Sequence, residues 1–424
     1  MFETRPKKAQ ERALLIGLEK DGVSKWDLRD SMEELRELAN SAGAEVVDTI
    51  TQKLPKPTAP YYIGKGKAEL IKNSLQDREV TSVIFDDELS PAQGRNLETL
   101  LARKVLDRTQ LILDIFAQRA RSREGRLQIE LAQLQYLLPR LTRMWHHLSR
   151  QTGGIGTRGP GETQLEVDRR RVQERIARLE RELESVRKTR AVQRQGRKRH
   201  QWPVAAVVGY TNAGKSTLLN LLTGSDVVAV DKLFATLDPT TRSFVLPNKQ
   251  RVLLTDTVGF LRKLPHTLIE SFKATLEEVS EADLLIHIVD LSHPRVDEQM
   301  DAVDAVIKEI DAFGKQTLIV FNKIDRLKNR ELAGIYAKRF PGSVAISART
   351  GEGMGNLVQA LENALSSWRL RSRFCIPANE SALIAEIHRV GHVLEVRYEG
   401  DDALIVAHVP PHLEQKLARY AARD

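Results

Sequence analysis

The sequence predicts an α/β fold, in which helices cover mostly parallel sheets. Three observations predict it: apolar runs alternate with helical patterns over the first hundred residues, a glycine-rich loop joins a strand to a helix near residue 210, and two helical leucine seams lie between these regions. A chain of 424 residues exceeds what one hydrophobic core supports. We expect a small α/β domain (1–108), a helical hairpin (109–200), a larger α/β domain (201–367) and a small α+β domain (372–424).

The N-terminal domain is predicted from alternating strand and helix signals. The expected strands are Ala13 to Leu18, Ala44 to Ile50 and Thr81 to Asp86, and the expected helices begin near Ser31, Lys67 and Pro91. Glu34 follows Ser31 at the spacing of a capping box. Residues 64–67 (Gly-Lys-Gly-Lys) resemble a phosphate loop but lack the Ser or Thr and the full spacing, so we interpret them as a basic turn that opens a helix.

The next segment carries the positive charge of the chain. Residues 119–200 contain 21 Lys or Arg and 9 Asp or Glu, a net charge of +12, whereas the whole chain carries +8. Apolar residues spaced by four and three over 127–148, and again over 165–186, predict two helices that pack as an antiparallel coiled coil. The connection, 149–163, is too glycine-rich for a helix and predicts a flexible tip, with Thr163 a candidate cap for the returning helix.

An arginine-rich hairpin predicts a nucleic-acid partner. A coiled coil buries only its seams, and guanidinium groups suit bidentate contact with phosphate. Tyr136 and Trp145 lie near the seam and are expected to be core residues, which favours recognition of RNA backbone and shape over reading of bases. A basic amphipathic segment also suits a membrane surface, but the hairpin needs the apolar stripes for itself.

A strand, a glycine-rich loop and a helix over 204–222 predict a phosphate-binding site. Glycines let the loop G-x-x-x-x-G-K-S wrap closely around phosphates, the helix N-terminus faces their charge, and Lys215 adds a cation. Ser216 is placed to ligate Mg²⁺. The residues of this loop expected to bind nucleotide are Gly209, Tyr210, Thr211, Asn212, Ala213, Gly214, Lys215, Ser216 and Thr217.

Two further loops predict guanine as the base. Asn322, Lys323 and Asp325 follow the apolar strand 317–321. The Asp carboxylate can accept hydrogen bonds from guanine N1–H and the 2-amino group, a pair of donors that adenine lacks, while Lys323 packs along the base. A base with the wrong edge would leave the carboxylate unpaired, at a cost of about 1–3 kcal/mol or more. The other expected contact is a backbone N–H turned toward guanine O6 from Ser347, Ala348 or Arg349.

Two segments are expected to sense the γ-phosphate. Asp256 ends the strand 251–255 and is suited to hold a Mg²⁺-bound water, and the N–H of Gly259 is suited to contact the γ-phosphate. The other segment offers the hydroxyls of Thr236, Thr240 and Thr241, and spacing alone does not choose among them. The expected nucleotide-binding residues of both segments are Phe234, Ala235, Thr236, Leu237, Asp238, Asp256, Thr257, Val258 and Gly259.

Phe260 stands where many GTPases carry a glutamine that orients the attacking water. Because phenylalanine cannot make those hydrogen bonds, we expect slow intrinsic hydrolysis that a partner raises by ordering the site or supplying the missing group. The alternative is that a residue elsewhere already positions the water. The residues expected to act in catalysis are Lys215, Thr236 and Gly259.

The remaining features exclude several classes of protein. One cysteine, Cys375, excludes a disulfide framework and is expected to be a buried structural thiol in a reducing compartment. No apolar run approaches a membrane span, so we expect a soluble protein without stable membrane association. The last domain should run strand, helix, strand, strand, helix, with a turn over 399–402. His388 and His392 lack partners at metal spacing.

These motifs together resemble the HflX family of GTPases. The most specific is the string over 153–166, Gly-Gly-Ile-Gly-Thr-Arg-Gly-Pro-Gly-Glu-Thr-Gln-Leu-Glu, joined by Phe-Ala-Thr-Leu-Asp over 234–238 and Asp-Thr-Val-Gly-Phe over 256–260. The likeness covers residues 1 to about 366, and the last domain looks like an extension of some bacterial members. The resemblance implies Ser216 and Thr236 as Mg²⁺ ligands, with Asp256 acting through water, and it agrees with a hydrophobic Phe260.

The resemblance also implies a partner and a function. It implies a cytoplasmic bacterial GTPase that binds the large (50S) ribosomal subunit, with the N-terminal region on 23S ribosomal RNA and the tip, 149–163, near the peptidyl transferase centre. Similar factors split stalled or idle ribosomes into subunits under stress such as heat. We therefore expect a monomer that uses GTP, GDP and Mg²⁺. The alternatives are a helicase-like RNA-remodelling NTPase and a membrane-associated signalling G protein.

Overall fold

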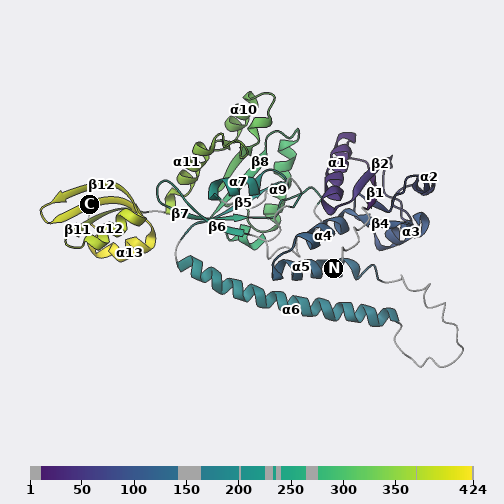
Figure 1. Cartoon of the computed structure of the whole chain (residues 1–424), viewed down its shortest axis with the longest axis horizontal. Coiled ribbons are helices and arrows are strands. Elements are labelled where there is room, and N and C mark those ends of the chain that lie inside the picture. The colour runs from purple at the N-terminus through teal and green to yellow at the C-terminus, as the bar shows by residue number, and fades with distance from the viewer. Residues whose placement is uncertain are drawn as a thin grey trace, which may run out of the picture. The chain divides into compact units, whose positions relative to one another are not determined.

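The computed structural model describes residues 11–141, 164–199, 202–224, 233–234, 240–263, 276–368 and 370–422. Three sheets organise the described residues, and Figure 1 shows each with its own helices. The chain divides into two units, of which the first holds residues 1–185, 232–234 and 262–272 and the second holds the rest. Each unit is described by itself.

The first unit is built on a four-stranded parallel sheet in the order β2-β1-β3-β4. Its strands are β1 (Arg12–Glu19), β2 (Glu45–Lys53), β3 (Ser82–Phe85) and β4 (Lys104–Asp107), and its helices are α1 (Lys25–Ala42), α2 (Lys65–Asp77), α3 (Pro91–Leu101) and α4 (Arg108–Arg119). Leu14, Ile16 and Phe85 are buried in its core. The predicted alternation is therefore confirmed, and so is the turn at Gly64 that opens α2. The prediction missed β4, which has four residues.

The predicted start of the first helix at Ser31 is wrong. Ser24 caps α1: its hydroxyl accepts from the N–H of Asp27, and the Asp27 carboxylate accepts from the N–H of Ser24. Both serines have an acidic residue three positions later, so capping spacing alone does not distinguish them. The distinguishing signal is Leu28, which is buried and extends the apolar stripe of α1 toward its N-terminus.

Two helices of the predicted hairpin are present in part. The helix α5 (Arg123–Leu137) ends two residues before Pro139, so the predicted seam does not continue along it. The helix α6 (Gln164–Arg199) returns, and Arg175 pairs with Glu130 of α5 at 2.7 Å. Leu179 and Leu183 of the second seam are buried. Trp145, Thr163 and the tip 149–163 lie outside the described residues.

The second unit contains a six-stranded sheet in the order β10-β9-β8-β5-β7-β6, parallel except between β6 and β7. Its strands are β5 (Val204–Gly209), β6 (Thr240–Val245), β7 (Arg251–Asp256), β8 (Leu284–Asp290), β9 (Thr317–Asn322) and β10 (Val344–Ala345). The helices α7 (Lys215–Thr223) and α11 (Met354–Ala364) pack in one apolar cluster, and α9 (Val296–Glu309) and α10 (Glu331–Arg339) pack in another. The sheet is thus covered on both faces, as in Figure 1.

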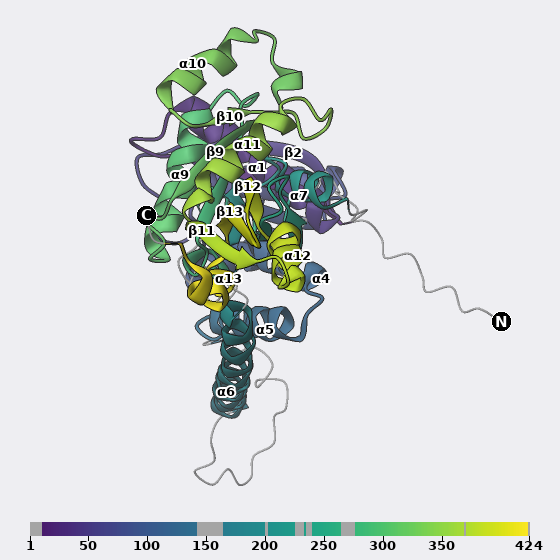
Figure 2. The same cartoon turned by 90° about the vertical axis from the view of Figure 1, so that its left-hand side faces the viewer.

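A three-stranded antiparallel sheet closes the second unit. Its elements are β11 (Leu370–Pro377), α12 (Ser381–Val390), β12 (His392–Glu399), β13 (Asp402–Val409) and α13 (Pro411–Leu417), the predicted order and turn. Figure 2 shows the helices α12 and α13 beside this sheet, and their side chains pack in its core. Cys375 is half-buried rather than buried, because it alternates with Phe374 and Ile376, which face the core. His388 and His392 are exposed.

None of the described helices combines the length and the apolar character needed to cross a membrane. The longest of them, α6, is rich in arginine.

Candidate functional site

The loop between β5 and α7 has the close-packed backbone of a phosphate-binding loop. Gly209 has φ 149° and Gly214 has φ 98°, a region that disfavours side chains. A Cβ atom on Gly209 would lie 2.3 Å from the carbonyl oxygen of Ile288, and one on Gly214 would lie 2.2 Å from Nδ2 of Asn322. Both positions therefore require glycine, as the motif predicts.

Lys215 is buried at the start of α7 with its ammonium group inside the loop. Nζ donates to the carbonyl oxygens of Gly209 at 3.1 Å and Tyr210 at 2.7 Å. An ammonium group has three N–H donors, so one remains for a phosphate oxygen. Burial lowers the pKa of Lys215 to about 8, against the opposing charge of Asp256. A bound phosphate would favour the protonated form.

The hydroxyl and carboxylate predicted to serve Mg²⁺ lie together. Ser216 Oγ donates to Asp256 Oδ2 at 2.9 Å, and Asp256 is buried at the end of β7. Oxygen donors of this kind are the ligands that Mg²⁺ prefers. The pair therefore fits a Mg²⁺ ion, which Ser216 would hold directly and Asp256 through water.

The structure describes only part of the first γ-phosphate segment. Thr240 and Thr241 both lie in β6, where the hydroxyl of Thr241 is 3.0 Å from that of Thr255. Phe234 is buried, and its ring packs edge-on against Phe116 at 4.6 Å between centroids. Residues 235–239, which include Ala235, Thr236, Leu237 and Asp238, lie outside the described residues.

The second γ-phosphate segment is hydrogen-bonded to the phosphate loop. The N–H of Thr211 donates to the carbonyl oxygen of Phe260 at 2.8 Å, and the N–H of Phe260 donates to Gly209 at 3.1 Å. A Cβ atom on Gly259 would lie 2.9 Å from the backbone Cα of Thr211, so glycine is needed there. The Phe260 ring is buried, and it offers no polar group to an attacking water.

Asn322 joins the base-recognition loops to the phosphate loop. Its Nδ2 donates to the carbonyl oxygen of Ala213 at 2.8 Å, and its Oδ1 accepts from the N–H of Ala348 at 2.9 Å. That N–H, a predicted contact for guanine O6, already has a partner, so it would bind guanine as a shared donor or after a small shift. Asn322 therefore fixes the distance between the phosphate loop and the loop that contains Ala348.

Asp325 is held ionised for its predicted contact with guanine. The hydroxyl of Ser347 donates to Oδ1 at 2.7 Å, and Arg349 lies 2.8 Å from Oδ2. That hydrogen bond, with the positive charge of Arg349, lowers the pKa of Asp325 although burial opposes it. Arg349 is mostly exposed, so it can move aside when the base takes this edge.

Sequence reasoning missed two residues of β8. Asp290, at the end of the strand, pairs with Lys323 at 2.7 Å and positions this cation beside the base loop. The signal that could have found it is its place at a strand end, like that of Asp256. His287 is buried, and burial together with the charge of Lys215 lowers its pKa to about 4. It is therefore a neutral core residue at physiological pH.

The chain is similar to several known proteins. Three family models match: "GTP-binding GTPase N-terminal" over 29–117, "GTP-binding GTPase Middle Region" over 119–197 and "50S ribosome-binding GTPase" over 204–323. The chain is 47% identical to a GTPase HflX of Lacrimispora saccharolytica, covering 97% of this chain and 96% of the relative. It is 46% identical to a GTPase HflX of Magnetococcus marinus, covering 100% and 98%. A GTP-binding protein from Sulfolobus solfataricus in complex with GDP is 27% identical, covering 84% and 99% with a TM-score of 0.45.

Proposed function

The chain belongs to the HflX family of GTPases, and on that premise we propose that its GTP-bound form binds the large (50S) ribosomal subunit and that hydrolysis of GTP to GDP releases it. The observation that carries the proposal is the position of the basic helix. α6 ends at Arg199 and the nucleotide-binding strand β5 begins at Val204, so few residues separate the arginine-rich segment from the phosphate loop. Folded RNA is the partner that such a charge suits.

The chain's own residues suggest how the nucleotide state is read. Lys215 and the loop N–H groups would hold the phosphates, and Asp325 would hold the guanine edge. Ser216 and Thr236 would hold Mg²⁺, with Asp256 acting through water, and the ion when bound neutralises phosphate charge. Gly259 and Thr236 would order around the γ-phosphate and relax after its loss.

The finer role is also a proposal. The tip, 149–163, would enter the peptidyl transferase centre while the N-terminal domain contacts 23S ribosomal RNA, and this wedge would split stalled or idle ribosomes under heat stress. Support comes from the hairpin's charge and from the family model's description. Because Phe260 offers no group to orient water, the ribosome would supply or order that group and raise hydrolysis.

Co-sedimentation with 50S subunits tests the switch. We expect strong binding with a GTP analogue, weak binding with GDP, and loss of binding when residues 150–161 are trimmed. Linkage requires the 50S subunit to strengthen GTP binding by the same factor. Equal binding to 50S subunits with the GTP analogue and with GDP would contradict the proposed nucleotide switch. A rate of GTP hydrolysis that 50S subunits do not raise would contradict the role proposed for Phe260. 70S ribosomes that stay intact after incubation with the protein and GTP would contradict ribosome splitting.

A further inference from the structure

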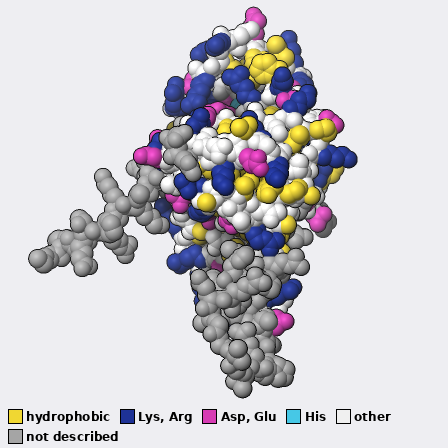
Figure 3. All heavy atoms as spheres, turned by 90° about the vertical axis from the view of Figure 1, so that its right-hand side faces the viewer, with side chains coloured by type: hydrophobic (Ala, Val, Ile, Leu, Met, Phe, Trp, Pro, Cys, Tyr) yellow, Lys and Arg dark blue, Asp and Glu magenta, His cyan; other side chains and the backbone are white. Residues whose placement is uncertain are grey.

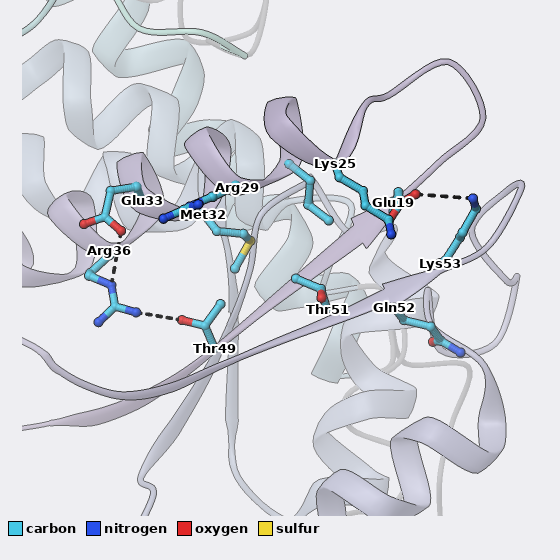
Figure 4. A pocket seen from close by; sticks show the side chains of 11 residues that line it. Glu19, Lys25, Arg29, Met32, Glu33, Arg36, Thr49, Thr51, Gln52 and Lys53 are labelled. Atoms are coloured by element: carbon cyan, nitrogen blue, oxygen red, sulfur yellow. Dashed lines mark hydrogen bonds and ion pairs between the residues drawn. The ribbon is translucent and has the colours of Figure 1, made fainter. Parts of the chain in front are cut away.

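A groove between α1 and β2 of the first unit has no part in the nucleotide site. Its volume is about 700 Å³, and Figure 4 shows side chains of both elements around it. Leu28 and Met32 of α1 give it an apolar side, and Thr49 and Thr51 of β2 give it hydroxyls. β2 is an edge strand of the four-stranded sheet, so this side of the sheet is open to a partner.

The groove carries positive charge that the chain does not neutralise. Lys53 lies 3.4 Å from Glu19, and Arg36 lies 3.7 Å from Glu33 and donates to Thr49 at 3.1 Å, the dashed lines of Figure 4. These two pairs account for both carboxylates that line the groove.

Two cations remain after those pairs. Within the described part of the chain, Lys25 and Arg29 have no ion pair and no side-chain hydrogen bond. They stand four residues apart on α1, which places both side chains on one face of the helix. The nearby carboxylate of Asp27 is engaged with Ser24 in the capping box. The groove therefore offers two adjacent charges to an anion.

An exposed aromatic residue lies on the same helix as the two cations, outside the lining of the groove. Trp26 is 68% exposed, an unusual position for so large an apolar side chain. It precedes Arg29 by three residues, so the two are neighbours on the helix surface. On the face of the molecule drawn in Figure 3, Lys and Arg side chains are more widespread than Asp and Glu side chains. Stacking on an aromatic ring beside cations that contact phosphates is how proteins bind single-stranded nucleic acid.

We propose that this groove binds a single-stranded segment of RNA, with Lys25 and Arg29 on neighbouring phosphates and Trp26 stacked on a base. The groove is too large for one phosphate, and an acidic peptide would leave Trp26 without a stacking partner. The exposed hydroxyl of Thr51 can contact a ribose 2′-OH. The assignment of ribosomal RNA as the source of the strand rests on the proposed function, but the binding chemistry of the groove does not.

The test uses the full chain and a short oligoadenylate RNA labelled for fluorescence anisotropy. We expect the double variant Lys25→Glu/Arg29→Glu to bind about tenfold or more weakly and to lower the salt slope of log K by about 1.4, the value for two single-strand phosphate contacts. The matched control, Lys56→Glu/Lys72→Glu, makes the same charge change at two exposed lysines of the same domain and should leave both values unchanged.

Tryptophan fluorescence gives a local readout of the same groove. RNA should quench the wild-type signal, Trp26→Phe should remove that quench while keeping most of the affinity, and Trp26→Ala should weaken binding about fivefold or more. Equal affinities for the two charge-reversed proteins would overturn the proposal. Equal competition for the labelled oligoadenylate by free adenosine monophosphate, whose base does not fit the guanine loops, or by oligoglutamate, would overturn the choice of RNA.

Co-sedimentation with 50S subunits separates this proposal from the proposed function. If wild-type protein fails to bind subunits in either nucleotide, the proposed function fails while the oligoadenylate result stands. If the groove variant binds oligoadenylate like wild type while the tip-trimmed protein loses subunits, the groove proposal alone fails.

Discussion

Two buried cations lie at the carboxyl ends of parallel sheets in this protein, and the chain treats them differently. Lys215, beside the end of β5, is held by two backbone carbonyls. Arg108, directly after β4, lies 2.6 Å from Glu34 and 3.6 Å from Asp86. One cation therefore has dipoles for partners, and the other has carboxylates.

The same difference extends to the neighbouring carboxylates. In the first unit, Asp86 accepts from Ser31 and Lys263, and Asp107 accepts from Tyr136 at 2.7 Å and from Leu89. Its sheet end is filled by the chain's own donors. The carboxyl end of a parallel sheet is a common ligand site, but it becomes one only where the chain leaves charge for a ligand to satisfy.

The largest expected effect comes from removing Arg108, the cation that pairs with carboxylates at the sheet end of the first unit. Arg108→Met removes the buried guanidinium that pairs with both Glu34 and Asp86, while Lys263 still pairs with Asp86, and this loss should cost about 3–5 kcal/mol of stability in the first unit. The exposed pair of Arg78 and Asp48 gives the control, and Arg78→Met should cost less than about 1 kcal/mol. Hydrogen exchange of the first unit measures both. A stability loss for Arg108→Met no larger than that of the control would contradict the contrast.

The second-largest expected effect comes from removing Lys215, the cation that has an N–H donor left for a phosphate. Lys215→Ala should lower the rate of GTP hydrolysis about 10²–10³-fold, because a preorganised positive group is lost where phosphate charge develops. Stability should change little, since no carboxylate within the described residues forms an ion pair with Lys215. Lys308→Ala, at a lysine that lies over the Phe313 ring, is the control. Marked unfolding of Lys215→Ala would show that this lysine is structural, like Arg108.

Asp325→Asn should change which base is bound. The amide oxygen can still accept from N1–H, but the amide N–H then faces the 2-amino donor of guanine, whereas it can donate to the 2-oxo group of xanthine. Affinity for GTP should therefore fall about 10²-fold while affinity for xanthosine triphosphate rises. Competition binding measures both nucleotides. Asp297→Asn, at an exposed pair with Arg339, should alter neither. Unchanged preference would remove Asp325 from base recognition.

The contrast also explains what the sequence could predict. The site loops are predictable because phosphate and guanine demand fixed residues at fixed spacing, such as the glycine at 214 that Asn322 requires. The paired sheet end of the first unit could not be predicted, because Arg108, Glu34 and Asp86 come together from separate segments without a motif. The start of α1 was misplaced because two capping signals competed. The end of α5 was missed because the leucine spacing continues past Pro139.

The smallest expected effect is a change in the protonation of Lys215 when nucleotide binds, which distinguishes Lys215 from Arg108. Burial lowers the pKa of Lys215 to about 8, and a bound phosphate should return it toward the usual value of 10.5. Nucleotide binding should then take up about half a proton at pH 8 and about 0.1 at pH 7. The stability of the free protein should change with pH in the opposite direction to its nucleotide affinity. Between pH 8 and 10.5 the unfolded chain binds more protons than the folded chain, so the free energy of unfolding rises with pH while nucleotide affinity falls. Calorimetry of GDP binding in buffers of different ionisation enthalpy measures the uptake. Lys215→Arg, whose guanidinium keeps its proton as Arg108 does, should bind without uptake; an unchanged uptake in that variant would assign the proton to another group.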